Sequence, residues 1–366
     1  MPLAAFCVKI AQMNFPLIIS QYWQPALFTL VGGFLFTWLA VRYFVQWGLK
    51  DRPHLYGLSR APIAYYGGLA IFPIFALGVL LFAPLEPHIM ALLLSASVVM
   101  LLGFFDDLLN LPPLLRIFVQ IIAALIIVFA GIGIFSINIP FFGILDLDNV
   151  VWHGIPVFSA IFTVIWVLAI LNTMNFVDGV SGLSSGVTFI GGLTIFFISV
   201  NPLLHENLAS QSGVAIVSLI LSMVALSFLI FDFPKPKILL GDSGSTFFGF
   251  LIAVLAIFSG GKVATAFLVL GIPILDMVWV ILRRFFTGQK IWKGDRKHLH
   301  HRLLELGLSQ RKVVLLYLVA TAILGFTAAQ TISSQQKLYL MIALVVIMGV
   351  LAVFLVKSSL KKAFDK

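Results

Sequence analysis

Two adjacent aspartates, Asp106 and Asp107, stand at the end of a long apolar run, and Asn110 follows shortly after them. Side chains three or four positions apart on a helix lie on the same face, so Asn110 can share a pocket with both carboxylates. Two neighbouring carboxylates repel each other unless a cation or a shared proton relieves the charge. The pair therefore indicates metal-linked or acid/base chemistry, with a plain water-exposed helix end as the alternative.

A second polar stripe interrupts an apolar run further along the chain. Asn172, Asn175 and Asp178 recur at every third position, which keeps them near one helix face. Gly179 and Gly182 follow, and glycine permits a tight turn and a close approach of a ligand to the backbone. Amide and carboxylate oxygens are ligands that suit magnesium. The stripe therefore predicts part of a magnesium site, and a helix end capped by asparagine and glycine is the alternative.

A third segment, Gly241-Asp242-Ser243-Gly244-Ser245-Thr246, opens another apolar run. The free N–H groups and the positive dipole end at a helix start favour a bound phosphate. A carboxylate beside such an anion makes sense mainly when it holds a metal that bridges to the phosphates. We therefore expect Asp242 to bind a metal near a phosphate site, the alternative being a simple Asp or Ser cap.

A basic segment near the end of the chain carries three histidines, His298, His300 and His301, between Arg296 and Arg302. The chain has a single cysteine and no partner motif, so a structural zinc site is not expected here. Arginine and neutral histidine can together grip a diphosphate. A basic patch against the membrane surface is the alternative.

Apolar helices must position these segments. The chain of 366 residues is 61% hydrophobic and 10% charged, with a mean hydropathy of +1.11, which excludes an ordinary soluble protein. Runs long enough to cross a bilayer recur, without the alternation of barrel strands. We expect an all-α polytopic membrane protein with about eleven membrane-spanning helices. Their expected starts lie near Ala26, Tyr66, His88, Leu114, Val157, Ser184, Ser212, Ser245, Val263, Val313 and Leu338.

Basic residues indicate the orientation, because cytoplasmic connections of membrane proteins are enriched in lysine and arginine. All but three of the 23 basic residues fall on one face, the exceptions being Lys9, Lys262 and Lys337. We therefore expect the N-terminus outside, the C-terminus in the cytoplasm and a basic cytoplasmic connection at about 283–312. This bias explains the net charge of +9 without a nucleic-acid partner. No repeat or linker divides the chain, so one membrane domain over 1–366 is expected.

In this order and on one face, the four segments resemble the polyprenyl-phosphate N-acetylhexosamine-1-phosphate transferases, the glycosyltransferase 4 family. The matching residues run from Asp51 to Arg302. The run His298-Leu299-His300-His301-Arg302-Leu303, preceded by Asp295-Arg296, is similar to the bacterial undecaprenyl-phosphate N-acetylglucosamine-1-phosphate transferase branch. The expected number of spans also fits that branch better than the peptidoglycan branch.

The resemblance implies roles for individual residues. Asp106 and Asp107 match an acidic pair that acts on the lipid phosphate, which Arg116 would also contact. Asp242 and Asn175 match positions associated with magnesium, for which manganese can substitute. The residues grouped as substrate-binding, through nucleoside, sugar or diphosphate contacts, are Asn172, Asp178, Gly179, Arg296, His298, His300, His301 and Arg302.

Two departures from the family pattern limit this transfer of roles. Ser181 stands where many relatives have an acidic or amide residue, which leaves the details of donor recognition open. The first cytoplasmic connection, from Asp51 to Gly68, is shorter than usual and lacks the Lys-x-His pattern. Its residues therefore receive no role.

The resemblance implies an enzyme that transfers N-acetylhexosamine 1-phosphate, with GlcNAc 1-phosphate expected, from a UDP-sugar to undecaprenyl phosphate. UMP would be released and a cell-envelope glycan initiated, on the cytoplasmic face of a multi-pass inner-membrane protein with magnesium as cofactor; a homodimer is left open. Within the family, the alternative is the phospho-N-acetylmuramoyl-pentapeptide transferase reaction. A secondary transporter is the alternative from another class, but its acids should lie near mid-membrane rather than at helix ends.

Overall fold

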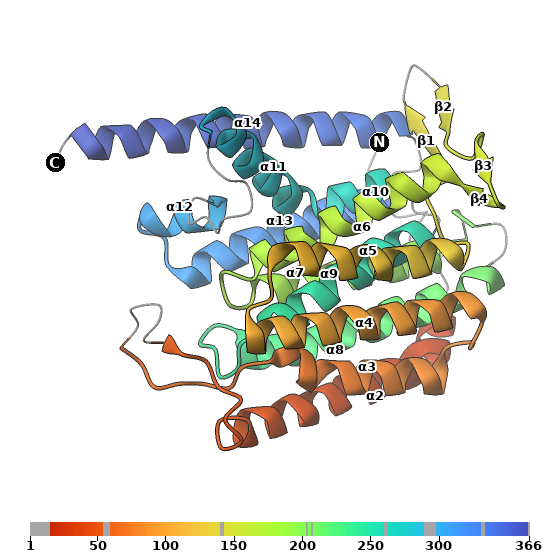
Figure 1. Ribbon diagram of the computed structural model, residues 1–366, viewed down its shortest axis with the longest axis horizontal. Coiled ribbons are helices and arrows are strands. Elements are labelled where there is room, and N and C mark those ends of the chain that lie inside the picture. Colours follow the sequence, from red (N-terminus) through yellow and green to blue (C-terminus); the bar gives the residue numbers. More distant parts are fainter. Residues whose placement is uncertain are drawn as a thin grey trace.

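The computed structural model describes residues 15–53, 59–139, 143–202, 204–205, 208–259, 263–288, 298–330 and 334–364. Helices make up most of this part (Figure 1). They are α2 (Phe15–Tyr43), α3 (Gly67–Phe82), α4 (Pro87–Leu109), α5 (Pro113–Phe129), α6 (Val157–Val177), α7 (Leu183–Ser199), α8 (Ser212–Asp232), α9 (Gly241–Phe258), α10 (Val263–Val269), α11 (Gly271–Phe286), α12 (Leu299–Glu305), α13 (Gln310–Gln330) and α14 (Ser334–Phe364).

The helices confirm a polytopic membrane protein. Within the described ranges, seven of them are long and apolar enough to cross a membrane, namely α2, α4, α6, α8, α9, α13 and α14. The shorter apolar helices α3, α5 and α7 lie between them in the chain. Every predicted start of a span lies in or directly beside a helix. The total of eleven crossings and their direction stay predictions.

The ninth predicted span, which begins near Val263, is divided between two helices. α10 ends at Val269 and α11 begins at Gly271. Pro273 lies in the first turn of α11. Proline has no N–H, so it cannot make the hydrogen bond to the Val269 carbonyl that one continuous helix would require. α11 then packs against α6 and α14.

The connection between α5 and α6 departs from the all-α expectation. Strand β1 (Ser136–Ile139) pairs antiparallel with β2 (Gly143–Asp146), and β3 (Val151–Trp152) pairs with β4 (Ile155–Pro156). Positive φ angles of 47° at His153 and 81° at Gly154 give the turn between β3 and β4, the geometry of tight two-residue hairpins. Strands this short leave too few positions for an alternating pattern to be recognised.

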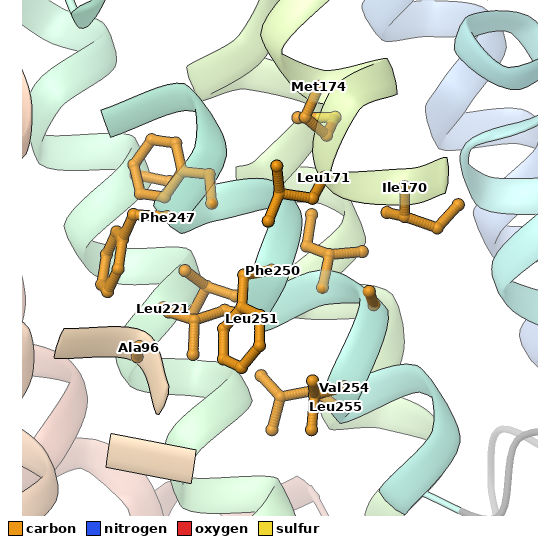
Figure 2. Packing of buried hydrophobic residues seen from close by; sticks show 14 of the residues in the cluster. Ala96, Ile170, Leu171, Met174, Leu221, Phe247, Phe250, Leu251, Val254 and Leu255 are labelled. Carbon is orange, nitrogen blue, oxygen red and sulfur yellow. The ribbon is translucent and has the colours of Figure 1, made fainter. Parts of the chain in front are cut away.

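Helix α9 forms the centre of the bundle. It packs against α4 and α6 and also contacts α3, α7 and α8. Figure 2 shows Phe250 and Leu251 of α9 among Leu171 of α6 and Leu221 of α8. All of these side chains are fully buried. The start of α9 is therefore held inside the protein rather than at its rim.

Two glycines permit the close packing of α9. A Cβ at Gly103 of α4 would lie 2.5 Å from the Cα of Ser243. A Cβ at Gly249 of α9 would lie 2.8 Å from the Cα of Leu171 in α6. Both distances are shorter than real Cβ contacts, so a larger residue would push the helices apart. This packing sets the polar ends of α4 and α6 beside the first turn of α9.

Candidate active site

Asp107 of α4 caps the start of α9. Its Oδ1 accepts the N–H of Asp242 at 2.9 Å, and its Oδ2 accepts the N–H of Ser243 at 3.0 Å. Tyr65, just before α3, donates its hydroxyl to Oδ1 at 2.9 Å. A carboxylate at this place satisfies free N–H groups and complements the helix dipole. Asp107 thus fixes the first turn of α9 and, with it, the position of Asp242.

Asp106 binds different groups from its neighbour. Its carboxylate accepts the N–H of Leu111 at 2.8 Å and Nη1 of Arg116 at 2.8 Å, and its side chain is only 7% exposed. The left-handed conformation of Asn110, with φ of 50°, ends α4 and lets the chain turn into α5, which carries Arg116. The same Nη1 lies 3.8 Å from Oδ2 of Asp242. One guanidinium therefore links α4, α5 and α9.

Asn175 of α6 brings the second polar stripe to the same place. Its Nδ2 donates to Oδ1 of Asp242 at 2.8 Å and to Oγ of Ser245 at 3.1 Å. The side chain of Asp242 is 35% exposed, so a ligand can reach the carboxylate. We call Asp106, Asp107 and Asp242 the carboxylate cluster; Arg116 and Asn175, also predicted, contact it directly.

Asn172 binds the body of the helix bundle instead. Its Nδ2 donates to Oε1 of Gln120 at 3.1 Å and to the carbonyl of Leu168 at 2.8 Å. Gln120 is buried on α5, one helical turn after Arg116. Sequence reasoning missed Gln120, although a buried amide in an apolar helix was a readable signal. This pair ties α5 to α6 beneath Arg116, and a substrate contact of Asn172 stays a prediction.

The turn after α6 is held by a second carboxylate that sequence reasoning missed. Asp232, the last residue of α8, is 1% exposed. It accepts the N–H of Gly182 at 2.7 Å and the hydroxyl of Ser185 at 2.9 Å. Since α7 begins at Leu183, Asp232 caps α7 from a neighbouring helix. The turn between α6 and α7 is thereby fixed to α8.

Asp178 follows the last residue of α6. Burial raises the pKa of Asp178 well above its ordinary value, and the charges of Asp232, Asp242 and Asp107 raise it further. Carboxylates of α4, α8 and α9 therefore lie close enough to act on Asp178.

Asp276 of α11 organises the histidines. Its Oδ1 accepts the N–H of Leu299 at 2.8 Å, at the start of α12, and its Oδ2 lies 3.3 Å from Nδ1 of His298. The ring of His298 stacks on that of His300, with centroids 5.6 Å apart. Sequence analysis noted no role for Asp276, because its partners lie more than twenty positions later in the chain. We call His298, His300 and His301 the histidine segment.

The histidine segment meets the end of α6 at Gly179. A Cβ at Gly179 would lie 3.1 Å from Nε2 of His300 and 3.4 Å from Nε2 of His301. Burial lowers the pKa of His300 to about 3, with His301 and His298 adding to the effect, so its ring is neutral at ordinary pH. Within the described residues, neither ring nitrogen of His300 has a hydrogen-bond partner. The neutral ring of His300 thus lies beside the turn that follows Asp178.

Arg302 lines a different space from these histidines. It borders an apolar cavity of about 160 Å³ between α11, α12 and α14, together with Asp276 and Leu299. Arg296 lies outside the described residues. The structure therefore brings His300 and His301 to the end of α6, while diphosphate contacts of Arg302 and Arg296 stay predictions.

The charges of the carboxylate cluster fit a bound cation. Arg116 is the cation that contacts this cluster in the described part of the chain, so three carboxylates face one guanidinium. In the same part, no three His, Cys, Asp or Glu side chains form a ready-made metal site. Magnesium is usually held by one or two carboxylates together with substrate phosphates and water. The oxygens of Asp242 and Asn175 suit such a partly open site.

Comparison with known proteins gives one consistent family. Residues 89–260 match glycosyl transferase family 4. The chain is 30% identical over 335 residues to the probable undecaprenyl-phosphate N-acetylglucosaminyl 1-phosphate transferase of Bacillus subtilis. The aligned region covers 88% of this chain and 89% of that protein. The chain is 28% identical over 358 residues to the undecaprenyl-phosphate alpha-N-acetylglucosaminyl 1-phosphate transferase of Salmonella typhi, covering 93% of this chain and 92% of that protein. It is 32% identical over 282 residues to a decaprenyl-phosphate N-acetylglucosaminephosphotransferase of Mycobacterium tuberculosis, covering 71% and 68%.

Proposed function

Because the chain belongs to glycosyl transferase family 4, we propose that it transfers GlcNAc 1-phosphate from UDP-GlcNAc to undecaprenyl phosphate and releases UMP. The observation that carries this proposal is that the end of α6 joins two sets of groups: Asn175 contacts the partly exposed Asp242, and Gly179 lies beside the neutral His300 and His301. Such a site suits two phosphorylated substrates, the lipid phosphate and the nucleotide sugar. The names of the relatives favour N-acetylglucosamine over the peptidoglycan precursor.

The reaction joins two anions that repel each other, so the protein must mainly position them and compensate their charge. An oxygen of the lipid phosphate attacks the β-phosphorus of the donor, and the bond from that phosphorus to the bridging oxygen of UMP breaks. We assign the acceptor side to Asp106, which takes any remaining proton of the lipid phosphate. Its partner Arg116, 2.8 Å away, would contact that phosphate.

Asp107 contributes by holding the site in place. Three hydrogen bonds, from Tyr65, Asp242 and Ser243, engage its two carboxylate oxygens. These bonds hold the carboxylate against the first turn of α9 and the Tyr65 hydroxyl. Within the acidic pair, Asp106 thus faces the acceptor and Asp107 positions Asp242.

Asp242 and Asn175 would hold a magnesium ion, or manganese in its place. When bound, the metal neutralises the charge of the donor diphosphate. Asp242 presents its carboxylate at the start of α9, where Asp107 already accepts the N–H groups of Asp242 and Ser243. Asp107 keeps that first turn in register, because it accepts the N–H of Asp242 itself.

The donor would lie along the turn after α6. Asp178 and Gly179 would contact the nucleoside. His300 and His301, which lie beside Gly179, would contact the sugar and the diphosphate. A neutral imidazole can donate one hydrogen bond and accept another, which suits a ligand that carries hydroxyls as well as phosphates. His298, Arg302, Arg296 and Asn172 complete the predicted set.

The membrane arrangement belongs to the same proposal. One domain over 1–366 would cross the bacterial inner membrane eleven times, with the N-terminus outside and the active site on the cytoplasmic face. The distribution of basic residues supports this orientation. A reporter fused after Asn149 should report the exterior, and one fused after Lys237 the cytoplasm. A cytoplasmic signal at Asn149 would contradict the assigned orientation.

A substrate panel tests the function. The purified protein is incubated with undecaprenyl phosphate, magnesium and UDP-GlcNAc, UDP-GalNAc or UDP-N-acetylmuramoyl-pentapeptide, and the lipid product is identified by mass. We expect undecaprenyl diphosphate GlcNAc and an equal amount of UMP from UDP-GlcNAc alone. Release of UDP, or a lipid product from the pentapeptide donor only, would overturn the proposal. The Asp242→Asn variant serves as the inactive control.

A further inference from the structure

The hairpins between α5 and α6 carry an unusual surface for a segment outside the helices. Between Gly133 and Pro156 the sequence contains no lysine or arginine, and its acidic residues are Asp146 and Asp148. Ile144 and Leu145 of β2 are 65% and 49% exposed. Neighbouring strand residues point to opposite faces, so β2 exposes an apolar side chain on each face.

The second hairpin also exposes apolar side chains. Val151 and Trp152 of β3 are 58% and 68% exposed. A two-stranded hairpin is at best marginally stable alone in water, and contiguous exposed apolar groups mark an interaction surface. Something other than water should therefore cover these side chains.

The position of the hairpins identifies what covers them. Phe129 ends α5 and Phe158 lies in the first turn of α6, and both are exposed on the apolar surfaces of these helices. β4 ends directly before α6, and β1 begins shortly after α5 ends. Figure 1 shows the hairpins at the ends of α5 and α6, reaching across the direction of the helix axes rather than extending them. A segment in this place lies along the membrane surface.

We propose that the two hairpins lie in the interfacial layer of the bilayer, at the leaflet where α5 ends and α6 begins. Tryptophan is enriched in this layer, because its ring is apolar and its N–H is polar. Ile144, Val151 and Trp152 would enter the layer, while Asp148 stays in water. The hairpins anchor the ends of α5 and α6, the helices that carry Arg116 and Asn175 at their other ends. This inference does not depend on the proposed reaction.

Site-directed spin labelling tests the anchor. The single cysteine makes the design simple, because Cys7→Ser gives a background without reactive thiols. Ile144→Cys, Val151→Cys and Trp152→Cys are labelled one at a time in that background, with Asp148→Cys as the matched control in the same connection. Each protein is reconstituted in phospholipid vesicles, and its collisions with oxygen, which prefers lipid, and with a water-soluble nickel chelate are compared.

We expect oxygen collisions to dominate at positions 144, 151 and 152, and nickel collisions to dominate at 148. Nickel collisions dominating at all four positions would place the hairpins in water and overturn the proposal. Immobile labels that neither reagent reaches would show a protein partner instead and would also overturn it. Three independent apolar positions keep the test decisive if one variant fails to fold, and monodispersity in detergent identifies such a variant.

Discussion

The carboxylate cluster and the histidine segment both lie beside the end of α6 and differ in their chemistry. In the cluster, charged groups bind one another and the start of α9, and Asp242 keeps 35% of its side chain exposed. In the histidine segment, His300 is 1% exposed, and burial holds its pKa near 3, so the ring carries no charge. One half of the site thus manages charge, whereas the other places the neutral ring of His300 beside Gly179.

The largest effect should come from removing charge at Asp242. Asp242→Asn keeps the size of the side chain but weakens a hard-cation ligand. We expect turnover to fall about 100-fold or more, the usual cost of removing one positioned electrostatic group from an active site. The rate of lipid product formation measures this effect, with Asp148→Asn in the α5–α6 connection as control. Near-normal turnover in Asp242→Asn would contradict the proposal that this carboxylate holds the metal.

Mutation in the histidine segment should mainly affect the use of the UDP-sugar. His301→Ala should lower kcat/KM for the UDP-sugar about 10- to 100-fold, because a hydrogen bond to a charged group contributes about 1.5–3 kcal/mol. The KM for undecaprenyl phosphate should stay unchanged. Steady-state kinetics with each substrate varied in turn measures both constants. A raised lipid KM with an unchanged donor constant would favour the membrane-surface role for this basic segment.

A smaller effect should follow at the turn that joins the two regions. Asp232→Ala removes Oδ2, the single oxygen that accepts both the Gly182 N–H and the Ser185 hydroxyl. A buried polar group without its partner costs about 1–3 kcal/mol, so thermal unfolding in detergent should occur at a lower temperature. Donor KM should rise with little change in kcat. An unchanged unfolding temperature and donor KM would show that the turn does not need this cap.

The last effect concerns pH. The pKa of His300 lies near 3 in the folded protein and at 6.5 ordinarily, so the unfolded chain binds more protons between these values. Stability should therefore decrease as the pH falls below 6.5, by up to about 1.4 kcal/mol per pH unit from this group. His300→Gln removes the titration, and its unfolding temperature should fall less steeply with acid. Equal slopes for the two proteins would mean that His300 is not kept neutral by the fold.

Much of this arrangement could be predicted from local patterns, because apolar runs and polar interruptions are local properties of the sequence. The starts of the helices follow from them. The grouping of Asp106, Arg116, Asn175 and Asp242 was expected from the order of the segments together with the family resemblance, and the structure brings these residues into contact. The different contacts of Asp106 and Asp107 could not, since Asp107 binds backbone N–H groups 135 and 136 positions away.

Other features depend on tertiary packing or on very short signals. Asp232 lies at the start of a proline- and lysine-containing connection, where a lone carboxylate resembles any water-exposed residue. The break before α11 was readable in principle from Gly271 and Pro273. The hairpins were missed because strands of two to four residues give no reliable period.

The most direct test of the division between charge and neutral contacts is calorimetric titration of UDP-GlcNAc with and without magnesium. The wild-type protein should bind the donor much more tightly with magnesium, and Asp242→Asn should lose that magnesium dependence. Asp106→Asn should retain magnesium-dependent binding and lose turnover, the pattern of a group that acts on the way to the transition state. Normal magnesium-dependent binding in Asp242→Asn, together with its loss in both Asp106→Asn and Asp107→Asn, would contradict the account and assign the metal to the acidic pair.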